Sequence, residues 1–330
     1  MAKLNINVIL GHRGRFEALF DGRVQAEGLE LNASVTPFND LFRVVPQQDD
    51  FDVAELSVTG YLWGIQSGRD WIAIPVFPGW AFAAHADTVC NVRSGIESPR
   101  DLKGKRIGVP EYPVAAFLWI RDALESQYGI RAQDLQWFEE RQAEQSHYRL
   151  MNYAAPSDVS VEIIPKEKNL SDMLISGELD AVMRYLGTGK RGQMSLNDLG
   201  GHPSVKWLYA DRKAEAMTHC KRQGFFEPIH CVILKKSIAA KYPWVPMSLY
   251  KAFVEALRLS EDANYVTPAS YKLSMAEQIE VAGAGFSPVG IRSNRKAIDR
   301  MLVLAQRQGF TAGKDPLPLS RFFDASTLET

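Results

Sequence analysis

The sequence is poor in cysteine, in long apolar runs and in excess charge of either sign, and each shortage excludes a class of protein. Three cysteines occur in 330 residues, and an odd number cannot all pair within one chain, which favours a reducing compartment. The 38 basic and 39 acidic residues give a formal net charge of -1, so the basic surface that binds nucleic acid or anionic membranes is missing. The apolar stretches are far shorter than the roughly 20 residues that span a bilayer.

The N-terminus lacks the unbroken apolar segment of a signal peptide. Residues 4–10, with the sequence L-N-I-N-V-I-L, begin by alternating between apolar and polar side chains, which is the period of a half-buried β-strand. We therefore expect a protein that stays in the cytoplasm and that has neither a nucleic-acid partner nor a membrane partner.

What the sequence has is ample core material in a regular order. Hydrophobic residues make up 46% of the chain, and its length corresponds to about two compact units. Short apolar runs bounded by Gly or Pro alternate with helical patterns, which predicts an α/β protein with doubly wound mixed sheets flanked by helices. Strands are predicted at 4–10, 29–35, 51–55, 72–77, 106–109, 159–164, 179–183 and 229–234, and helices at 15–19, 39–45, 57–67, 113–128, 170–176, 237–241, 244–260 and 297–308.

The order of these elements predicts two lobes with a cleft between them. Lobe one comprises residues 1–110 and 226–330, lobe two comprises residues 111–225, and the hinge is expected near 109–111 and 225–228. Ligands of open α/β sheets bind beyond the carboxyl ends of the strands. The polar residues that follow predicted strands are therefore candidates for the site, namely His12, Glu55, Ser57, Glu111, Tyr112 and Arg184.

Four segments spread along the chain have a recognisable pattern. They are F-D-V-A-E-L-S at 51–57, K-G-K-R-I-G-V-P-E-Y at 103–112, L-S-D-M-L-I-S-G-E-L-D-A at 170–181 and P-W-V-P-M-S-L-Y-K-A-F at 243–253. Together they resemble the 4,5-dihydroxyphthalate decarboxylase family. The resemblance implies a periplasmic-binding-protein type II fold in an intracellular lyase that removes one carboxylate from a dihydroxylated aromatic diacid. It implies a small aromatic acid as the partner and no organic cofactor, and it leaves open a catalytic divalent ion and a homo-oligomer.

Three segments depart from the pattern of that family. Residues 12–15 read H-R-G-R where the family has D-Y-D-R, and residues 79–85 read G-W-A-F-A-A-H where it has a more basic segment. Residues 137–141 read W-F-E-E-R in place of a W-x-T-G-G motif. Because these segments follow strands, we expect a substrate related to 4,5-dihydroxyphthalate but less charged or larger.

Two residues are candidates for the catalytic proton transfer. Decarboxylation of an aromatic ring without a cofactor needs a proton donor to the ring carbon and a poorly solvated site for the leaving carboxylate. His230 lies in a predicted apolar strand and titrates near neutrality, although a lone histidine there is also consistent with a satisfied core residue. Glu55 is the rival acid, and its alternative role is to cap the helix that follows. The sequence leaves open which of the two donates the proton.

Arginines are the expected partners of a substrate carboxylate, because a guanidinium group matches it with two hydrogen bonds. We expect Arg15 and Arg184 to hold the ligand from opposite lobes. The alternatives are a surface position for Arg15 and an ion pair with Asp180 or Glu178 for Arg184. Further substrate contacts are expected from His12, Ser57, Trp80, Glu111 and Tyr112.

Structural roles compete with several of these predictions. Ser57 suits a helix N-cap, Trp80 suits a core position, and Tyr112 suits packing at the hinge. The spacing His85-x-Asp87-x-x-Cys90 matches no standard zinc pattern, so no metal site is predicted. A non-catalytic solute-binding protein for a small anionic or aromatic ligand is the alternative function, since one fold serves many functions; a different lyase on the same fold is a third.

Overall fold

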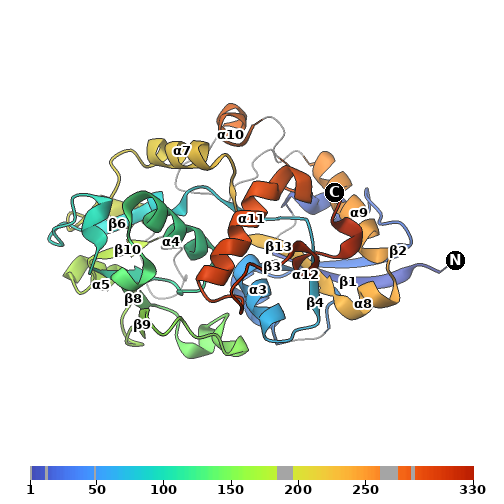
Figure 1. The fold of residues 1–330 in the computed structure, drawn as a ribbon, viewed down its shortest axis with the longest axis horizontal. Coiled ribbons are helices and arrows are strands. Elements are labelled where there is room, and N and C mark those ends of the chain that lie inside the picture. Colours follow the sequence, from blue (N-terminus) through green and yellow to red (C-terminus); the bar gives the residue numbers. More distant parts are fainter. Residues whose placement is uncertain (1, 12–13, 48–49, 184–195, 261–273, 284–286) are drawn as a thin grey trace.

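The computed structural model has two α/β lobes, each built on its own sheet (Figure 1). It describes residues 2–11, 14–47, 50–183, 196–260, 274–283 and 287–330. Both ends of the chain belong to the lobe on the right of Figure 1, and the middle of the chain forms the lobe on the left. The alternation of strands and helices in the sequence is therefore confirmed as a two-lobed α/β fold.

The sheet of the first lobe has five strands in the order β2-β1-β3-β13-β4. β1, β2 and β3 are parallel, whereas β13 runs antiparallel to both β3 and β4. The first residue of β13 therefore lies at the same edge as the carboxyl ends of β1 and β3. The bounds are β1 (Leu4–Leu10), β2 (Leu29–Val35), β3 (Val53–Ser57), β4 (Trp71–Ile74) and β13 (His230–Lys235).

The sheet of the second lobe has six strands in the order β11-β6-β10-β7-β8-β9. β10, β7, β8 and β9 are parallel, and β6 and β11 complete one side in antiparallel pairs. The carboxyl ends of β7 and β8 are thus neighbours. The bounds are β6 (Thr88–Asn91), β7 (Arg106–Val109), β8 (Gln136–Glu139), β9 (Ser160–Ile163), β10 (Ala181–Met183) and β11 (Val205–Trp207).

The chain crosses between the sheets at a two-stranded ribbon of β5 (Trp80–Ala81) and β12 (Glu227–Pro228). This corrects the first expected boundary at 109–111. Residues 88–91 and 106–109 both belong to the six-stranded sheet, so they lie in the second lobe and not in the first. The reason is that β6 runs antiparallel to β10, a pairing that sequence periodicity does not reveal.

The helices lie close to their predicted positions. Predicted and observed bounds agree at 170–176 and differ by a few residues elsewhere, most at the start of α11. The bounds are α1 (Glu17–Phe20), α2 (Phe38–Val44), α3 (Val58–Gln66), α4 (Ala115–Tyr128), α5 (Leu170–Ser176), α6 (Leu196–Gly201), α7 (Arg212–Gln223), α8 (Lys236–Lys241), α9 (Val245–Arg258), α10 (Met275–Ala282), α11 (Ile291–Arg307) and α12 (Leu319–Phe322).

The junction of β3 and α3 shows how a short sequence places a functional edge inside the protein. All five residues of β3 are buried, as expected for a central strand covered on both faces. The side chain of Ser57 then caps α3 by accepting a hydrogen bond from Gly60 N–H at 3.1 Å. An N-cap serine satisfies one of the unpaired amides of the first helical turn, so the strand ends and the helix begins without a connecting loop.

A segment of the second lobe, residues 146–153, docks on the first lobe. The hydroxyl of Tyr148 lies 2.9 Å from Ser57 Oγ and 2.8 Å from Thr59 Oγ1. Trp63 Nε1–H of α3 donates to the carbonyl of Met151 at 2.8 Å. This segment, which we call the docking segment, adds a non-covalent connection between the lobes to the two covalent crossings.

Candidate functional site

Glu55 and His230 lie on neighbouring strands and contact each other. His230 Nδ1 is 2.7 Å from Glu55 Oε1, and Glu55 Oε2 accepts a hydrogen bond from Gly11 N–H at 2.9 Å. Glu55 is only 2% exposed. A carboxylate can only accept at this contact, so the imidazole has its hydrogen on Nδ1. Nε2, on the opposite side of the ring, is then the nitrogen at which His230 gives or takes a proton.

Two further residues fix the position of the His230 ring. A Cβ atom at Gly79 would be 2.7 Å from His230 Nδ1, so the glycine leaves the space that the ring occupies. The ring of Phe42, on α2, packs edge-to-face against the imidazole with centroids 4.8 Å apart. The imidazole is therefore held by a carboxylate, a glycine backbone and an aromatic ring at the carboxyl edge of the first sheet.

Phe42 also contacts a histidine of the second lobe. The ring of His147 lies edge-to-face with Phe42, at a centroid distance of 5.8 Å. His147 is 5% exposed and belongs to the docking segment. Histidines from both lobes thus pack against one phenylalanine, and this is where the two sheet edges meet.

Glu111 and Arg141 support His147 from the ends of two adjacent parallel strands. Glu111 follows β7 and Arg141 follows β8, and Arg141 Nη1 donates to Glu111 Oε2 at 3.0 Å. Glu111 is 2% exposed and also accepts hydrogen bonds from Ser146 Oγ and from His147 N–H. Arg141 Nη1 lies 3.3 Å from His147 Nδ1. A buried ion pair therefore shapes the turn that presents His147.

Tyr148 acts as a structural contact between the lobes. Its ring and hydroxyl are buried, and burial raises the pKa of Tyr148 to about 12. The hydroxyl therefore stays protonated and its hydrogen bonds with Ser57 and Thr59 persist over the neutral range. Ser57 keeps the capping role that was the structural alternative for it, and it also ties the docking segment to the first lobe.

The remaining predicted residues divide into three groups. Arg15 is buried and its Nη2 donates to the carbonyl of Pro78 at 2.5 Å, which places it beside Gly79 and not at the surface. Trp80 and Tyr112 are core residues: Trp80 Nε1–H donates to the carbonyl of Phe77, and the guanidinium of Arg121 stacks on the Tyr112 ring at 4.1 Å. His12 and Arg184 lie outside the described residues.

Sequence reasoning missed Phe42, Arg141 and His147. Arg141 follows a strand that the prediction did not include, so the rule that identified Glu111 had no strand end to use there. His147 lies in a stretch without periodicity. An Arg and a His close to a strand end in such a stretch are the only signal that the sequence offers for them.

A second buried cluster of titratable groups lies beside the crossing ribbon. His85 Nε2 is 3.1 Å from Glu215 Oε1, and His219 Nε2 is 3.0 Å from Glu227 Oε1 in β12. The rings of His85 and His219 are 4.7 Å apart. Burial lowers the pKa of His85. Burial alone would raise the pKa of Glu227, but the hydrogen bond from His219 lowers it below its usual range.

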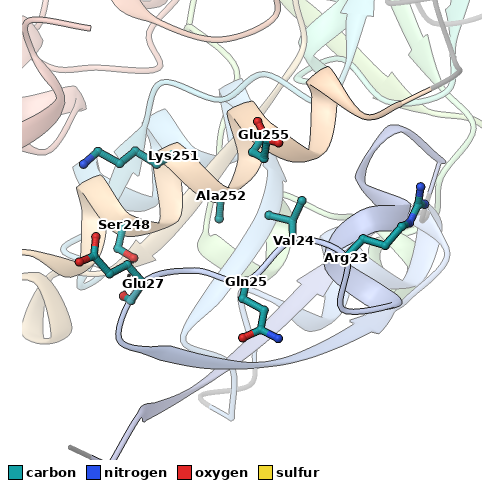
Figure 2. Close-up of a pocket in the computed structure, with 8 residues that line it drawn as sticks. All are labelled: Arg23, Val24, Gln25, Glu27, Ser248, Lys251, Ala252 and Glu255. Atoms are coloured by element: carbon teal, nitrogen blue, oxygen red, sulfur yellow. Dashed lines mark hydrogen bonds between the residues drawn. The ribbon is translucent and has the colours of Figure 1, made fainter.

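A depression of about 360 Å³ lies on the outer side of the first lobe, between α9 and the loop that precedes β2 (Figure 2). It has both cations and anions in its lining, and Arg23 and Glu255 are paired with Asp21 and Arg258. The balanced charges make it a poor match for an anionic ligand. It is lined by Arg23, Val24, Gln25, Glu27, Ser248, Lys251, Ala252 and Glu255.

The described residues show neither a metal-binding cluster nor a membrane-spanning helix. In that part of the chain, no three His, Cys, Asp or Glu side chains are grouped so that they could hold a metal ion. No described helix is both long enough and apolar enough to cross a bilayer. The cytoplasmic location and the absence of a cofactor stay predictions.

Solved structures with the same architecture include a binding protein and an enzyme. The periplasmic sulfonate-binding protein SsuA of Methylobacillus flagellatus KT superposes with a TM-score of 0.56 at 11% identity and covers 99% of this chain and 94% of its own. The desulfurization enzyme DszB in complex with biphenyl-2-sulfinic acid has a TM-score of 0.51 at 13% identity, over 99% of this chain and 98% of its own. These matches confirm the periplasmic-binding-protein type II fold.

Sequence comparison identifies the family. No protein-family model matches the chain. A 4,5-dihydroxyphthalate decarboxylase of Comamonas testosteroni is 32% identical over 337 residues, covering 100% of this chain and 99% of the relative. Another from Pseudomonas putida is 38% identical over 217 residues, covering 66% of this chain and 81% of the relative. The chain therefore belongs to the 4,5-dihydroxyphthalate decarboxylase family.

Proposed function

We propose that the protein is a decarboxylase that needs no organic cofactor and acts on a hydroxylated aromatic carboxylic acid bound between its lobes. The observation that carries the proposal is the 2.7 Å contact between His230 Nδ1 and Glu55 Oε1 at the carboxyl edge of a buried sheet. A histidine whose Nδ1 is held by a carboxylate has a defined tautomer and orientation, and its Nε2 is suited to proton transfer.

In the proposed reaction, protonated His230 transfers the proton on Nε2 to the ring carbon that bears the leaving carboxylate. The bond between that carbon and the carboxylate then breaks, its electron pair returns to the ring, and CO2 leaves. The products are the ring with hydrogen in place of the carboxylate, CO2 and neutral His230, which takes up a proton from water. Glu55 orients the imidazole and stabilises its cationic form, and no oxidant or reductant is needed.

Desolvation is the second element of the proposal. Glu55 and Glu111 are each 2% exposed, so the site is poor in water on both sides. A poorly solvated site favours loss of a charged carboxylate as neutral CO2. We propose that the lobes open about the β5–β12 ribbon to admit the acid and close over it, as hinged enzymes do.

The substrate is proposed to be a relative of 4,5-dihydroxyphthalate and not that compound itself. The two related proteins are named for it, but three segments near strand ends depart from the family pattern. Arg15, His12 and Arg184 are proposed to bind the acid. Support for Arg15 comes from its burial beside Pro78, since a buried guanidinium is suited to a carboxylate.

The test is turnover by the purified protein. Hydroxylated benzoates and phthalates, with 4,5-dihydroxyphthalate among them, are incubated with the wild type and with His230→Gln, and CO2 release is measured. We expect release from at least one acid by the wild type and its loss in the variant. Binding of an acid without CO2 release across the panel would refute the decarboxylase and favour the alternative, a solute-binding protein.

A further inference from the structure

We propose that His147 is a second substrate-contacting residue, which donates a hydrogen bond from Nε2 to a carboxylate oxygen of the acid. The inference rests on the proposed function for the identity of the ligand class. It assigns to the second lobe a specificity residue that the sequence did not reveal. Four features of the structure support it: the position of the ring, its tautomer, the rigidity of its backbone and the local charge.

The position follows from Phe42. Its ring contacts His230 at 4.8 Å and His147 at 5.8 Å between centroids, edge-to-face in both cases. The two imidazoles therefore flank one aromatic ring and come from opposite lobes. A benzene ring bound next to Phe42 would have the proton-transferring histidine on one side and His147 within reach on the other.

The tautomer follows from Arg141. Its Nη1 lies 3.3 Å from His147 Nδ1, and a guanidinium group has hydrogen-bond donors but no acceptor. His147 Nδ1 must then be the acceptor, which leaves the ring hydrogen on Nε2. The contact with Glu55 imposes the opposite arrangement on His230, whose hydrogen is on Nδ1. One histidine is thus suited to proton transfer, and the other is a fixed donor.

The backbone around His147 is anchored on both sides. Its N–H donates to Glu111 Oε2 at 3.3 Å, and Ser146 Oγ accepts from Tyr148 N–H at 3.2 Å. The hydroxyl of Tyr148 is tied to Ser57 and Thr59 of the other lobe. Such support holds a side chain in one geometry, as specificity requires.

The local charge favours a carboxylate as the acceptor. Arg141 is positively charged and its ion pair with Glu111 is buried, with side-chain exposures of 11% and 2%. Glu111 already accepts hydrogen bonds from Ser146 and His147 as well. A negatively charged acceptor at His147 Nε2 would therefore be next to a cation, and a charge-assisted hydrogen bond is stronger than a neutral one.

The experiment measures binding without turnover. Removal of one carboxylate from 4,5-dihydroxyphthalate leaves 3,4-dihydroxybenzoate, and catechol has the same hydroxyls with no carboxylate. Calorimetric titration with both compounds, and with 4,5-dihydroxyphthalate in the His230→Gln background, is carried out for the wild type, His147→Phe and His147→Gln. Glutamine places an N–H close to the position of Nε2, so it keeps the donor. His202→Gln, on a residue outside the site, is the matched control.

We expect His147→Phe to weaken binding of the carboxylated ligands by about tenfold, the usual size of a hydrogen bond to a charged group. Catechol binding should not change, and His147→Gln should restore most of the loss. Equal carboxylate affinity in the wild type and His147→Phe would overturn the inference, as would an equal loss in His147→Gln, or a wild type that binds no carboxylated ligand.

The same measurements separate this inference from the proposed function. If His147→Phe loses carboxylate affinity but the wild type releases no CO2 from any acid, the decarboxylase fails and the role of His147 stands. If the wild type releases CO2 and His147→Phe binds the carboxylated ligands as the wild type does, the decarboxylase stands and the role of His147 fails.

Discussion

Gly79 and His230 are matched in shape, because a Cβ at position 79 would be 2.7 Å from His230 Nδ1 and 2.9 Å from Cγ of its ring. The backbone carbonyl of the same glycine accepts hydrogen bonds from Ile229 N–H and His230 N–H. The position of the catalytic imidazole therefore depends on a residue in the segment that crosses between the lobes.

Gly79→Ala is expected to displace the imidazole from Glu55 and to reduce kcat by at least about tenfold, since small shifts of catalytic groups have large effects on rate. The free energy of unfolding should fall by about 1–3 kcal/mol, as for other overpacked sites. CO2 release and urea unfolding provide the two readouts. Gly201→Ala is the matched control, because a Cβ there meets nothing within 4 Å. Wild-type kcat in Gly79→Ala would contradict the assignment.

Glu55→Gln is expected to reduce kcat by about 10²–10⁴, as when an amide replaces the carboxylate that orients a catalytic histidine. The amide nitrogen introduced by the substitution would favour the tautomer of His230 with hydrogen on Nε2, and the cationic imidazole would lose its partner. KM should change little, because Glu55 faces His230 and Gly11. Steady-state kinetics test this. Glu97→Gln, at an exposed position, is the control, and a large rise in KM alone would argue against the role.

Tyr148→Phe is expected to lower the free energy of unfolding by about 1–3 kcal/mol, because two buried hydroxyls would lose a hydrogen-bond partner. Those hydroxyls belong to Ser57 and Thr59. Urea unfolding measures the change. Tyr153→Phe is a stringent control, since no partner for the Tyr153 hydroxyl is found among the described residues. If both variants matched the wild type, the docking segment would contribute nothing through Tyr148.

The stability of the protein should fall as the pH drops from 7 to 5, in part through His85. Burial lowers the pKa of His85 in the folded state, so below its ordinary pKa of about 6.5 the unfolded chain binds more protons at this site than the folded one. The stabilisation is present above that pH and is lost as the pH falls through the folded value.

His85→Gln should flatten this dependence, while its amide can still donate to Glu215. Urea unfolding at a series of pH values compares it with the wild type and with His202→Gln as the matched control. An unchanged slope would show that His85 does not titrate in this range. At lower pH, Glu227 adds a second loss, because the bond from His219 lowers its folded pKa and protonation removes that stabilisation.

Several features of the fold follow from local sequence. The run at 51–57 predicts a strand and a cap, and β3 and Ser57 provide both. The pattern at 170–176 predicts a helix, and α5 has the same bounds. Such features depend on neighbours in the chain, through the period of apolar side chains and the capping preference of serine.

The boundary between the lobes did not follow in the same way. The antiparallel pairing of β6 with β10 brings residues 88–91 into the second sheet, and short strands that pair over long separations leave no periodic trace. His147 was hidden for a similar reason, because its support comes from Glu111, 36 residues earlier in the chain.

The sequence by itself determined the α/β class, most of the elements and the presence of an acid and a histidine in buried strands. Only the tertiary structure decided that Glu55 and His230, 175 positions apart, share a hydrogen bond, and that His147 approaches the same phenylalanine from the other lobe. The physical reason is that burial and periodicity are local properties, whereas contact across a sheet depends on strand order and register.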